Sequence, residues 1–331
     1  MTIFSEALVD EGKEANMRKV QMRKNVVMTG VICLVLIFIS SEALAWASAT
    51  HAYMDNHLGK KGALNNLNEI YGGVMSDLFN TLFDYPEYLD FLPVQTHLKF
   101  MKVWKASRGD AEKSLAFGFV SHNDRWGADF TAHHACRTCG QPIGYAYAKA
   151  NVLLSEAPLP PDLGIPEKIA VEIFHEIVEN AVDILVKRTD PLIGSRLSSA
   201  ALARSPRFPQ LLVRAYAKRF ASFAGITELE AAQFIQSAEN DFGEAILSYG
   251  QIFLQDEATA IQLISEQTAN LAHEFLALYD IVLSIPQPQV VGMVASYMAL
   301  AIELCQDDYL EEIEATIPYV RHNLRIHGVT Y

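Results

Sequence analysis

The chain has 331 residues, half of them hydrophobic and a fifth charged. It therefore has material for one large or two ordinary domains, and disorder along its whole length is excluded. Its 26 basic and 39 acidic residues give a net charge of −13, so binding of duplex nucleic acid through its phosphates is not expected unless a site carries positive charge of its own, such as bound metal. Four cysteines are too few for a disulfide-scaffold protein.

The N-terminal segment has the features of a signal peptide. An apolar run over residues 26–39 follows a basic region and precedes a small-x-small pattern that ends at Ala45. The run is shorter than a comfortable transmembrane span and has the length of a signal-peptide hydrophobic region. We predict that residues 1–45 are removed, that Trp46 becomes the N-terminus, and that the protein is exported, periplasmic or secreted. A retained N-terminal anchor is the alternative, and the acidic first residues suggest translation from Met17 or Met22.

The rest of the chain reads as helical. Strand alternation and hairpin signals are almost absent, whereas helical periodicity is frequent. The clearest helix covers 165–189, where Pro166 suits the first turn and Lys187 and Arg188 complement the helix dipole. We predict an all-α fold with loops at 155–166 and 189–209, and a C-terminal helical region from 190 to 331. The other expected helices lie at about 47–58, 62–71, 94–106, 110–123, 142–154, 209–223, 227–237, 240–282 (as two helices), 288–305 and 307–326.

The histidines gather in the first part of the chain, with seven of the ten between residues 51 and 175. On one continuous helix, His122, Asp129 and His133 would share a face. His175 and Glu179 lie one turn apart on the 165–189 helix, a spacing that alone is more typical of a solvated face. Imidazole and carboxylate groups are zinc ligands, and a helical bundle can collect them from facing helices. The combined pattern favours an inward-facing metal site.

The cysteine pattern leaves three readings. Cys136 and Cys139 form a Cys-x-x-Cys pair, whereas Cys305 stands alone. In an exported protein a structural disulfide is the first interpretation. A metal knuckle with His133 and His134 ranks second, and a redox motif ranks third because no βαβ pattern surrounds the pair.

A series of short motifs also runs in order along the first part of the chain. Its members are the Ala45-Trp46 junction with Thr50-His51, the turn that ends at Asp77, Thr96-His97, the set His122, Asp129 and His133, and the pair His175 and Glu179. This order resembles the zinc-dependent phospholipase C family, which includes bacterial phosphatidylcholine phospholipases and clostridial alpha-toxin. It is similar, more distantly, to the fungal single-strand nucleases of the same fold. The resemblance covers about residues 46–189 and implies a phospholipase C/nuclease-like helical bundle.

The resemblance implies up to three Zn²⁺ ions. The first zinc would be held by Asp77, His97, His122 and Asp129; the second by Trp46, through its amino group and carbonyl, with His51 and a bridging Asp129; the third by His133, His175 and Glu179. The family spaces its middle triplet His-x3-Asp-x5-His, whereas this chain has His-x6-Asp-x3-His. Asp124 is therefore a rival for the bridging role, and His134 is a rival for His133.

The resemblance further implies a zinc-dependent phosphodiester hydrolase, most similar to phospholipase C, in which a zinc-activated water attacks phosphorus. Asp77 is the first candidate for the catalytic base, and Glu176 is the second. The implied substrate is a phospholipid or another phosphodiester, with possible contact to a membrane surface. A nuclease on the same metal site and a non-enzymatic exported helical binding protein are the alternatives.

Overall fold

The computed structural model describes residues 46–60 and 63–331, and within these residues the regular elements are all helical, without a strand. This confirms the predicted all-α class, while the predicted signal peptide, residues 1–45, lies outside the described residues. The helices are α2 (Ser48–Leu58), α3 (Ala63–Met75), α4 (Pro86–Leu89), α5 (Leu92–His97), α6 (Met101–Ala106), α7 (Gly109–His122), α8 (Ala128–His133), α9 (Tyr145–Glu156), the 3₁₀ turn η1 (Pro161–Leu163), α10 (Glu167–Thr189), α11 (Ile193–Ala203), α12 (Phe208–Ala224), α13 (Glu228–Ile252), α14 (Glu257–Ala277), α15 (Gln287–Cys305) and α16 (Tyr309–Ile326).

Three of the predicted boundaries were wrong. The predicted loop 189–209 contains α11, whose buried Leu197 and Ala201 let it pack into the core. The predicted helix 94–106 is two short helices, α5 and α6. The predicted break between 237 and 240 does not exist, because α13 continues to Ile252 and the chain breaks at 253–256.

Local capping explains where α13 and α14 begin. The Thr227 hydroxyl accepts from the backbone N–H of Glu230 at 3.2 Å, and the Glu230 carboxylate accepts from the backbone N–H of Thr227 at 2.8 Å. This reciprocal pair is a capping box, which satisfies two N–H groups of the first turn. Asp256 caps α14 by accepting from the N–H of Thr259 at 3.0 Å. The capping box thus fixes the start of α13, and the Asp256 cap fixes the start of α14 after the break at 253–256.

Close backbone contact joins α3, which precedes Asp77, and α7, which ends at His122. A Cβ atom on Gly72 would lie 2.0 Å from the carbonyl oxygen of Leu115, and one on Gly118 would lie 1.9 Å from that of Glu69. Only glycine permits this approach. The carbonyl of Gly73 is thereby placed against the end of α7, where His122 lies.

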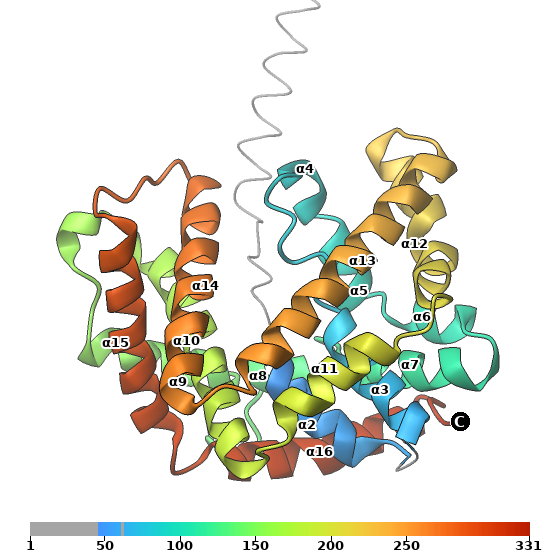
Figure 1. Ribbon diagram of the computed structural model, residues 1–331, viewed down its shortest axis with the longest axis horizontal. Helices are drawn as coiled ribbons and strands as arrows, with labels where there is room; N and C mark the ends of the chain where they lie inside the picture. The colour runs from blue at the N-terminus through green and yellow to red at the C-terminus, as the bar shows by residue number, and fades with distance from the viewer. Residues whose placement is uncertain (1–45, 61–62) are drawn as a thin grey trace, which may run out of the picture. The chain divides into compact units, whose positions relative to one another are not determined.

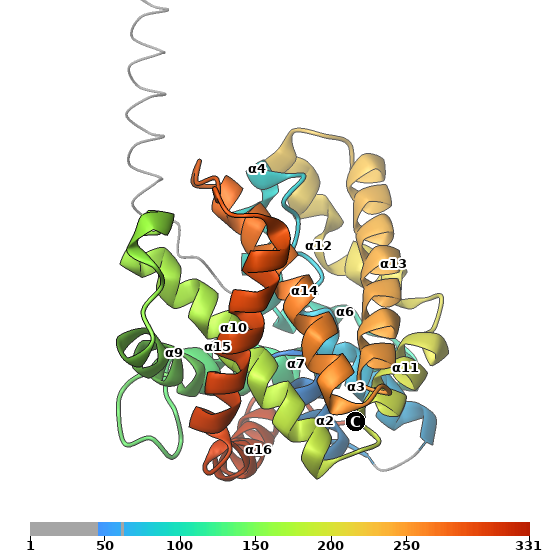
Figure 2. The ribbon, with the colours of Figure 1, turned by 60° about the vertical axis from the view of Figure 1, so that its left-hand side comes forward.

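Helices from both sides of residue 190 share one core. The α10 helix packs against α9, α14 and α15, and α11 packs against α2, α3 and α13. The α16 helix packs against α2, α7 and α8, and lies below them in both views (Figures 1 and 2). Buried side chains as distant in sequence as Trp46 and Val320 belong to one hydrophobic cluster. The predicted boundary at residue 190, between the first region and the C-terminal helical region, stays a prediction from the sequence.

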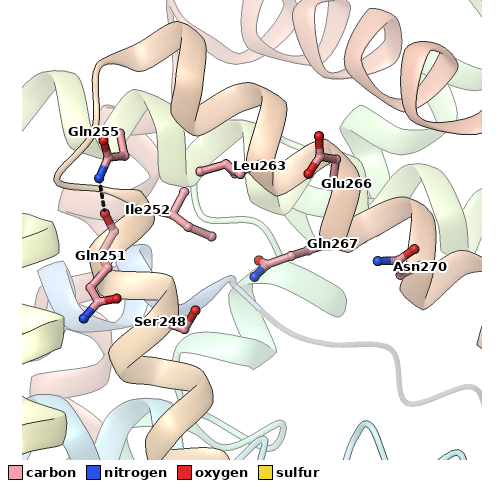
Figure 3. Close-up of a pocket in the computed structure, with 8 residues that line it drawn as sticks. All are labelled: Ser248, Gln251, Ile252, Gln255, Leu263, Glu266, Gln267 and Asn270. Carbon is pink, nitrogen blue, oxygen red and sulfur yellow. Dashed lines mark hydrogen bonds between the residues drawn. The ribbon is translucent and has the colours of Figure 1, made fainter. Parts of the chain in front are cut away.

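Two further features of the C-terminal region bear on function. Among the described helices, α15 alone has the length and composition to cross a membrane, and core helices of soluble proteins also meet this criterion. A surface pocket of about 410 Å³ lies between α13 and α14 (Figure 3), with Gln251, Gln255 and Gln267 among its lining residues. The side-chain amide of Gln255 donates to the backbone carbonyl of Gln251. No residue that lines this pocket is one of the predicted metal ligands.

Candidate metal centre

The predicted helix 110–123 is confirmed as α7, but His122, Asp129 and His133 do not share the face of one continuous helix. The α7 helix ends at His122 and α8 begins at Ala128. Between them the side chain of Asn123 accepts from the N–H groups of Arg125 and Trp126 at 2.9 and 3.0 Å, an alternative to helical hydrogen bonds. The turn is tight enough that a Cβ on Gly127 would lie 2.3 Å from the carbonyl oxygen of His122.

This turn nevertheless places Asp129 beside His122. Asp129 Oδ2 lies 2.7 Å from His122 Nε2 and 3.6 Å from His97 Nε2, while Asp129 Oδ1 lies 3.1 Å from His51 Nε2. The two oxygens of one buried carboxylate therefore face different histidines. That is the arrangement expected of a carboxylate that bridges two metal positions.

Two groups of potential ligands meet at His122. Its Nε2 lies 3.3 Å from Asp77 Oδ1, and His97 Nε2 lies 3.1 Å from the same oxygen. In each group the ligand atoms lie within 4.8 Å of one another, and the residues are buried. The groups are Asp77 with His97 and His122, and His51 with His122 and Asp129.

A third group lies at α8 and α10. Its members His133, His175 and Glu179 also offer atoms within 4.8 Å of one another. Glu179 Oε1 lies 2.8 Å from His175 Nε2 and 3.6 Å from His133 Nε2. The structure thus groups His133 with Glu179, and not with His122 and Asp129. The family resemblance implies this grouping, whereas a shared helix face would have placed His133 with His122.

The rival ligands occupy other places. Asp124 Oδ1 lies 3.1 Å from His133 Nδ1, and Asp124 Oδ2 lies 3.0 Å from Nε2 of the half-exposed His134. Asp124 is therefore placed to orient His133 rather than to bridge beside His122. These three residues form a further possible metal group, so the choice between His133 and His134 stays open.

In His97 and His122, a backbone carbonyl binds Nδ1, the ring nitrogen that faces away from the other potential ligands. His97 Nδ1 lies 3.0 Å from the carbonyl oxygen of Pro93, and His122 Nδ1 lies 2.6 Å from that of Gly73. A carbonyl oxygen only accepts, so Nδ1 carries a proton in both rings, and Nε2 is the ring nitrogen that would bind a metal. Metal-ligating histidines are oriented in this way by their outer-shell partners.

Orphaned polar atoms test whether a metal fits. Buried atoms without a hydrogen-bond partner include Nε2 of His51, both carboxylate oxygens of Asp129 and of Glu179, and both ring nitrogens of His175. Several of these atoms lie within ion-pair distance of one another but form no hydrogen bond among the described residues. Burying polar atoms without hydrogen bonds is costly, whereas a bound cation would satisfy them. The residues therefore fit a metal site. Nitrogen and oxygen donors suit zinc and other transition metals, so the donor set does not name the metal.

The pKa shifts in the site reflect both burial and the close approach of ionisable groups. Although burial opposes ionisation, His122 holds the pKa values of Asp77 and Asp129 below their ordinary values. Burial raises the pKa of Glu179 to about 8. Burial, together with the nearby His133, lowers the pKa of His175 to about 3, so this imidazole is neutral and available as a ligand.

Trp46 is fully buried next to α8. Its indole Nε1 donates to the carbonyl of Ala128 at 3.1 Å and to the hydroxyl of Thr131 at 3.3 Å. Its ring stacks on Tyr145 with a centroid distance of 5.4 Å. The side chain thus anchors Trp46 beside the helix that carries Asp129. Coordination through its amino group and carbonyl remains a prediction from the family resemblance.

The two candidate bases differ in their surroundings. Within the described part of the chain, the Asp77 side chain makes its close contacts through Oδ1. They are to Asn80 Nδ2 at 2.8 Å and to His97 and His122. Glu176 is half-buried, and its Oε1 accepts from Asn180 Nδ2 at 2.8 Å. Burial and the nearby Glu179 raise the pKa of Glu176 to about 8.

The cysteine pair is a disulfide, Cys136–Cys139, as the first interpretation predicted, and Cys305 is a buried free thiol. The carboxylate of Glu312, on α16, accepts from the backbone N–H groups of Arg137 and Thr138 at 2.8 Å. The disulfide loop, which follows His133 and His134, is thereby fastened to α16.

Sequence reasoning missed one buried carboxylate near these groups. Asp183, one turn after Glu179 on α10, is fully buried, and its carboxylate accepts hydrogen bonds from the N–H groups of Ala49 and Thr50 at the start of α2. The signal that could have pointed to it is the missing N-cap of α2, whose preceding residue, Ala47, has no side-chain acceptor.

No protein-family model matches the chain, and searches of curated proteins and of solved structures find no match either.

Proposed function

We propose that the protein is a zinc-dependent phosphodiester hydrolase, similar to phospholipase C, that holds up to three zinc ions. The observation that carries this proposal is the shared arrangement at Asp129 and His122. One carboxylate faces His51 through Oδ1 and His122 through Oδ2, and His122 also belongs to the group with Asp77 and His97. Closely spaced metal positions that share ligands are typical of enzymes that act on phosphate esters.

Bound zinc would supply positive charge that stabilises the reacting phosphate and would lower the pKa of water. The role of the chain is to hold and orient that charge in a buried site. Asp77 is the residue we assign to proton transfer, because its Oδ1 makes the contacts to the histidines, while its Oδ2 makes none with the residues that the structure describes. One carboxylate can thus act as a ligand through Oδ1 and accept a proton at Oδ2.

Glu176 is the second candidate. Its raised pKa, about 8, means that this carboxyl group holds a proton at neutral pH, which suits a proton donor better than a base. We therefore propose Asp77, before Glu176, as the catalytic base, in the same order as from the sequence.

The substrate we propose is a phospholipid, reached outside the cytosol. The net charge of −13 disfavours a long polyanion more than a lipid with one phosphodiester. A nuclease on the same residues is the second candidate, since zinc ions would offset part of that charge. An exported binding protein without catalysis is the third.

Parallel assays separate the three. The zinc-loaded protein is incubated with phosphatidylcholine vesicles and with single-stranded DNA, before and after chelation and after zinc is restored. We expect release of the phosphorylated headgroup, its loss on chelation, and its recovery with zinc. Cleavage of DNA alone would favour the nuclease. A protein that binds zinc but hydrolyses neither phosphodiester would refute the enzymatic proposal and favour the binding protein.

A further inference from the structure

The helix that carries His51 begins without a cap of its own. Ala47 precedes α2 and offers no side-chain acceptor, and the first turn of α2 contains no acidic residue. The N–H groups of a first helical turn have no partners within the helix and need acceptors from elsewhere. Because Trp46 and His51 flank this turn, whatever holds the turn also sets where these two residues lie.

Asp183 supplies the missing acceptor from α10, one turn beyond Glu179. Its Oδ2 accepts from the N–H of Ala49 at 2.6 Å, and its Oδ1 accepts from the N–H and the hydroxyl of Thr50 at 2.7 and 2.6 Å. The side chain is fully buried. A carboxylate at a helix N-terminus is also favoured by the helix dipole.

Tyr249 completes the arrangement from the C-terminal region. Its hydroxyl lies 2.9 Å from Asp183 Oδ2 and 3.1 Å from Asn180 Oδ1, and it donates to these oxygens. The amide of Asn180 in turn donates to Glu176 Oε1 at 2.8 Å. One residue of α13 is therefore connected both to the start of α2 and to the second candidate for proton transfer.

We propose that Asp183 and Tyr249 are positioning residues that hold the start of α2 so that Trp46 and His51 reach the metal position beside Asp129. This inference rests on the proposed function, because the positioned groups matter only if a metal binds there. It also gives the C-terminal region a role in the site. His51 Nε2 lies 3.1 Å from Asp129 Oδ1, and a displacement of about 1 Å at a catalytic site can cost about 100-fold in rate.

The test compares this pair with a matched carboxylate–tyrosine pair that joins α13 to α3. Glu239, on α13, is buried and accepts from the hydroxyl of Tyr71, on α3, at 2.8 Å, and neither residue contacts a predicted ligand in the described structure. The variants are Asp183→Asn and Tyr249→Phe, with Glu239→Gln and Tyr71→Phe as controls. Each is produced with its leader, and mass spectrometry checks that processing exposes Trp46. Zinc content at buffered free zinc and amide hydrogen exchange at Ala49 and Thr50 are then measured.

We expect Asp183→Asn to bind one of its zinc ions at least about tenfold more weakly, about 1.4 kcal/mol, with faster exchange at Ala49 and Thr50. Tyr249→Phe should shift both quantities in the same direction but less. The control variants should lower thermal stability without changing zinc affinity. If Asp183→Asn does not fold, Thr50→Val removes one of the same hydrogen bonds, and Thr50→Ser, which keeps the hydroxyl, should restore zinc affinity.

Folded Asp183→Asn or Thr50→Val proteins that bind every zinc ion with wild-type affinity would overturn this inference and leave the proposed function standing. A wild-type protein that binds no metal would overturn the proposed function, and with it the role of Asp183 in placing metal ligands. Exchange at Ala49 and Thr50 that does not change in Asp183→Asn would show that the carboxylate does not hold the helix start.

Discussion

The regions before and after residue 190 are both helical and share one core, but they bury polar groups differently. After residue 190 the buried carboxylates Glu239 and Glu312 each accept hydrogen bonds, from Tyr71 and from Thr138 and Arg137 respectively. Before it, the described residues include buried imidazole and carboxylate atoms that lack any such partner, and most of them belong to the three metal groups.

The difference separates packing from function. A buried carboxylate with its hydrogen bonds satisfied stabilises the contact it makes, whereas a cluster of unsatisfied donors and acceptors is costly without a ligand. We infer that the region before residue 190 supplies the metal ligands. The region after residue 190 positions residues near these ligands through hydrogen bonds of Tyr249, Glu312 and Thr316. Thr316 does so by donating to the hydroxyl of Thr131, which also accepts from Trp46.

The largest effect is expected from His122→Ala, because His122 belongs to two of the groups. Loss of an outer-shell partner alone costs about 10–100-fold in metal affinity or activity, so loss of a shared ligand should cost more than about 100-fold in hydrolysis and remove zinc from both groups. Zinc content and headgroup release measure these effects. His273→Ala, a histidine replacement in the second region, is the control and should change neither. Equal zinc content in the two variants would contradict the claim that the region before residue 190 supplies the metal ligands.

Asp124→Asn tests the orientation of His133. The carboxylate lies 3.1 Å from His133 Nδ1, and we expect zinc affinity at the third group to fall about 10–100-fold. His134→Ala removes the other partner of Asp124 and should leave zinc affinity near the wild-type value, because His134 is half-exposed and is not our predicted ligand. The opposite ranking of these two variants would assign the ligand role to His134.

Glu69 is a buried carboxylate of the region before residue 190 that belongs to none of the metal groups, so it tests whether burial alone distinguishes the two regions. It accepts from the N–H of Lys60 and from the hydroxyl of Tyr331, and burial raises its pKa from 4.5 to about 7. The folded state therefore binds this proton more tightly than the unfolded state. Stability from Glu69 is fully present below pH 4.5 and is lost as the pH rises to about 7.

The matching variant is Glu69→Gln, which cannot titrate. Between pH 4.5 and 8 the wild type should lose up to about 3 kcal/mol more unfolding free energy than the variant. Urea unfolding of both proteins at the two pH values measures this difference. Parallel pH profiles would show that the carboxyl group does not hold its proton in the fold.

Reduction of Cys136–Cys139 should have the smallest effect. The loop it closes is short, so the chain-entropy model gives only about 2 kcal/mol of stability. Thermal unfolding with and without reductant measures the loss, and Cys136→Ser with Cys139→Ser should reproduce it. We expect zinc affinity to stay within about threefold of the oxidised protein, because Glu312 still binds the loop through the backbone N–H groups of Arg137 and Thr138. A large loss of zinc on reduction would instead make the disulfide part of the site.

Much of the fold could be predicted from hydrophobic periodicity, but its breaks could not. The turn at 123–127 depends on hydrogen bonds of the Asn123 side chain and on close packing at Gly127, and neither interrupts the apolar pattern. The helix α11 lies between prolines that read as a loop. Periodicity reports which face is buried, whereas capping and backbone contacts decide where a helix stops.

The candidate site shows a similar division. The groupings that the family resemblance implies agree with the side chains that the structure brings together, except that His122 lies in both of the first two groups. The single helix face grouped His133 with His122, and the structure separates them. The role of Asp183 could not be predicted, because its partner Thr50 lies 133 positions away in the sequence.

The central claim is that Trp46 begins the mature chain and that the groups around Asp129 and Glu179 bind metal. The most direct test measures zinc per protein by mass spectrometry, in a form with Trp46 as the free N-terminus and in a form with one extra residue before it. We predict about three zinc ions in the first form, one each for the groups that contain His51, His97 and His175, and about one fewer in the second. No stoichiometric zinc or other metal in either form would contradict the claim.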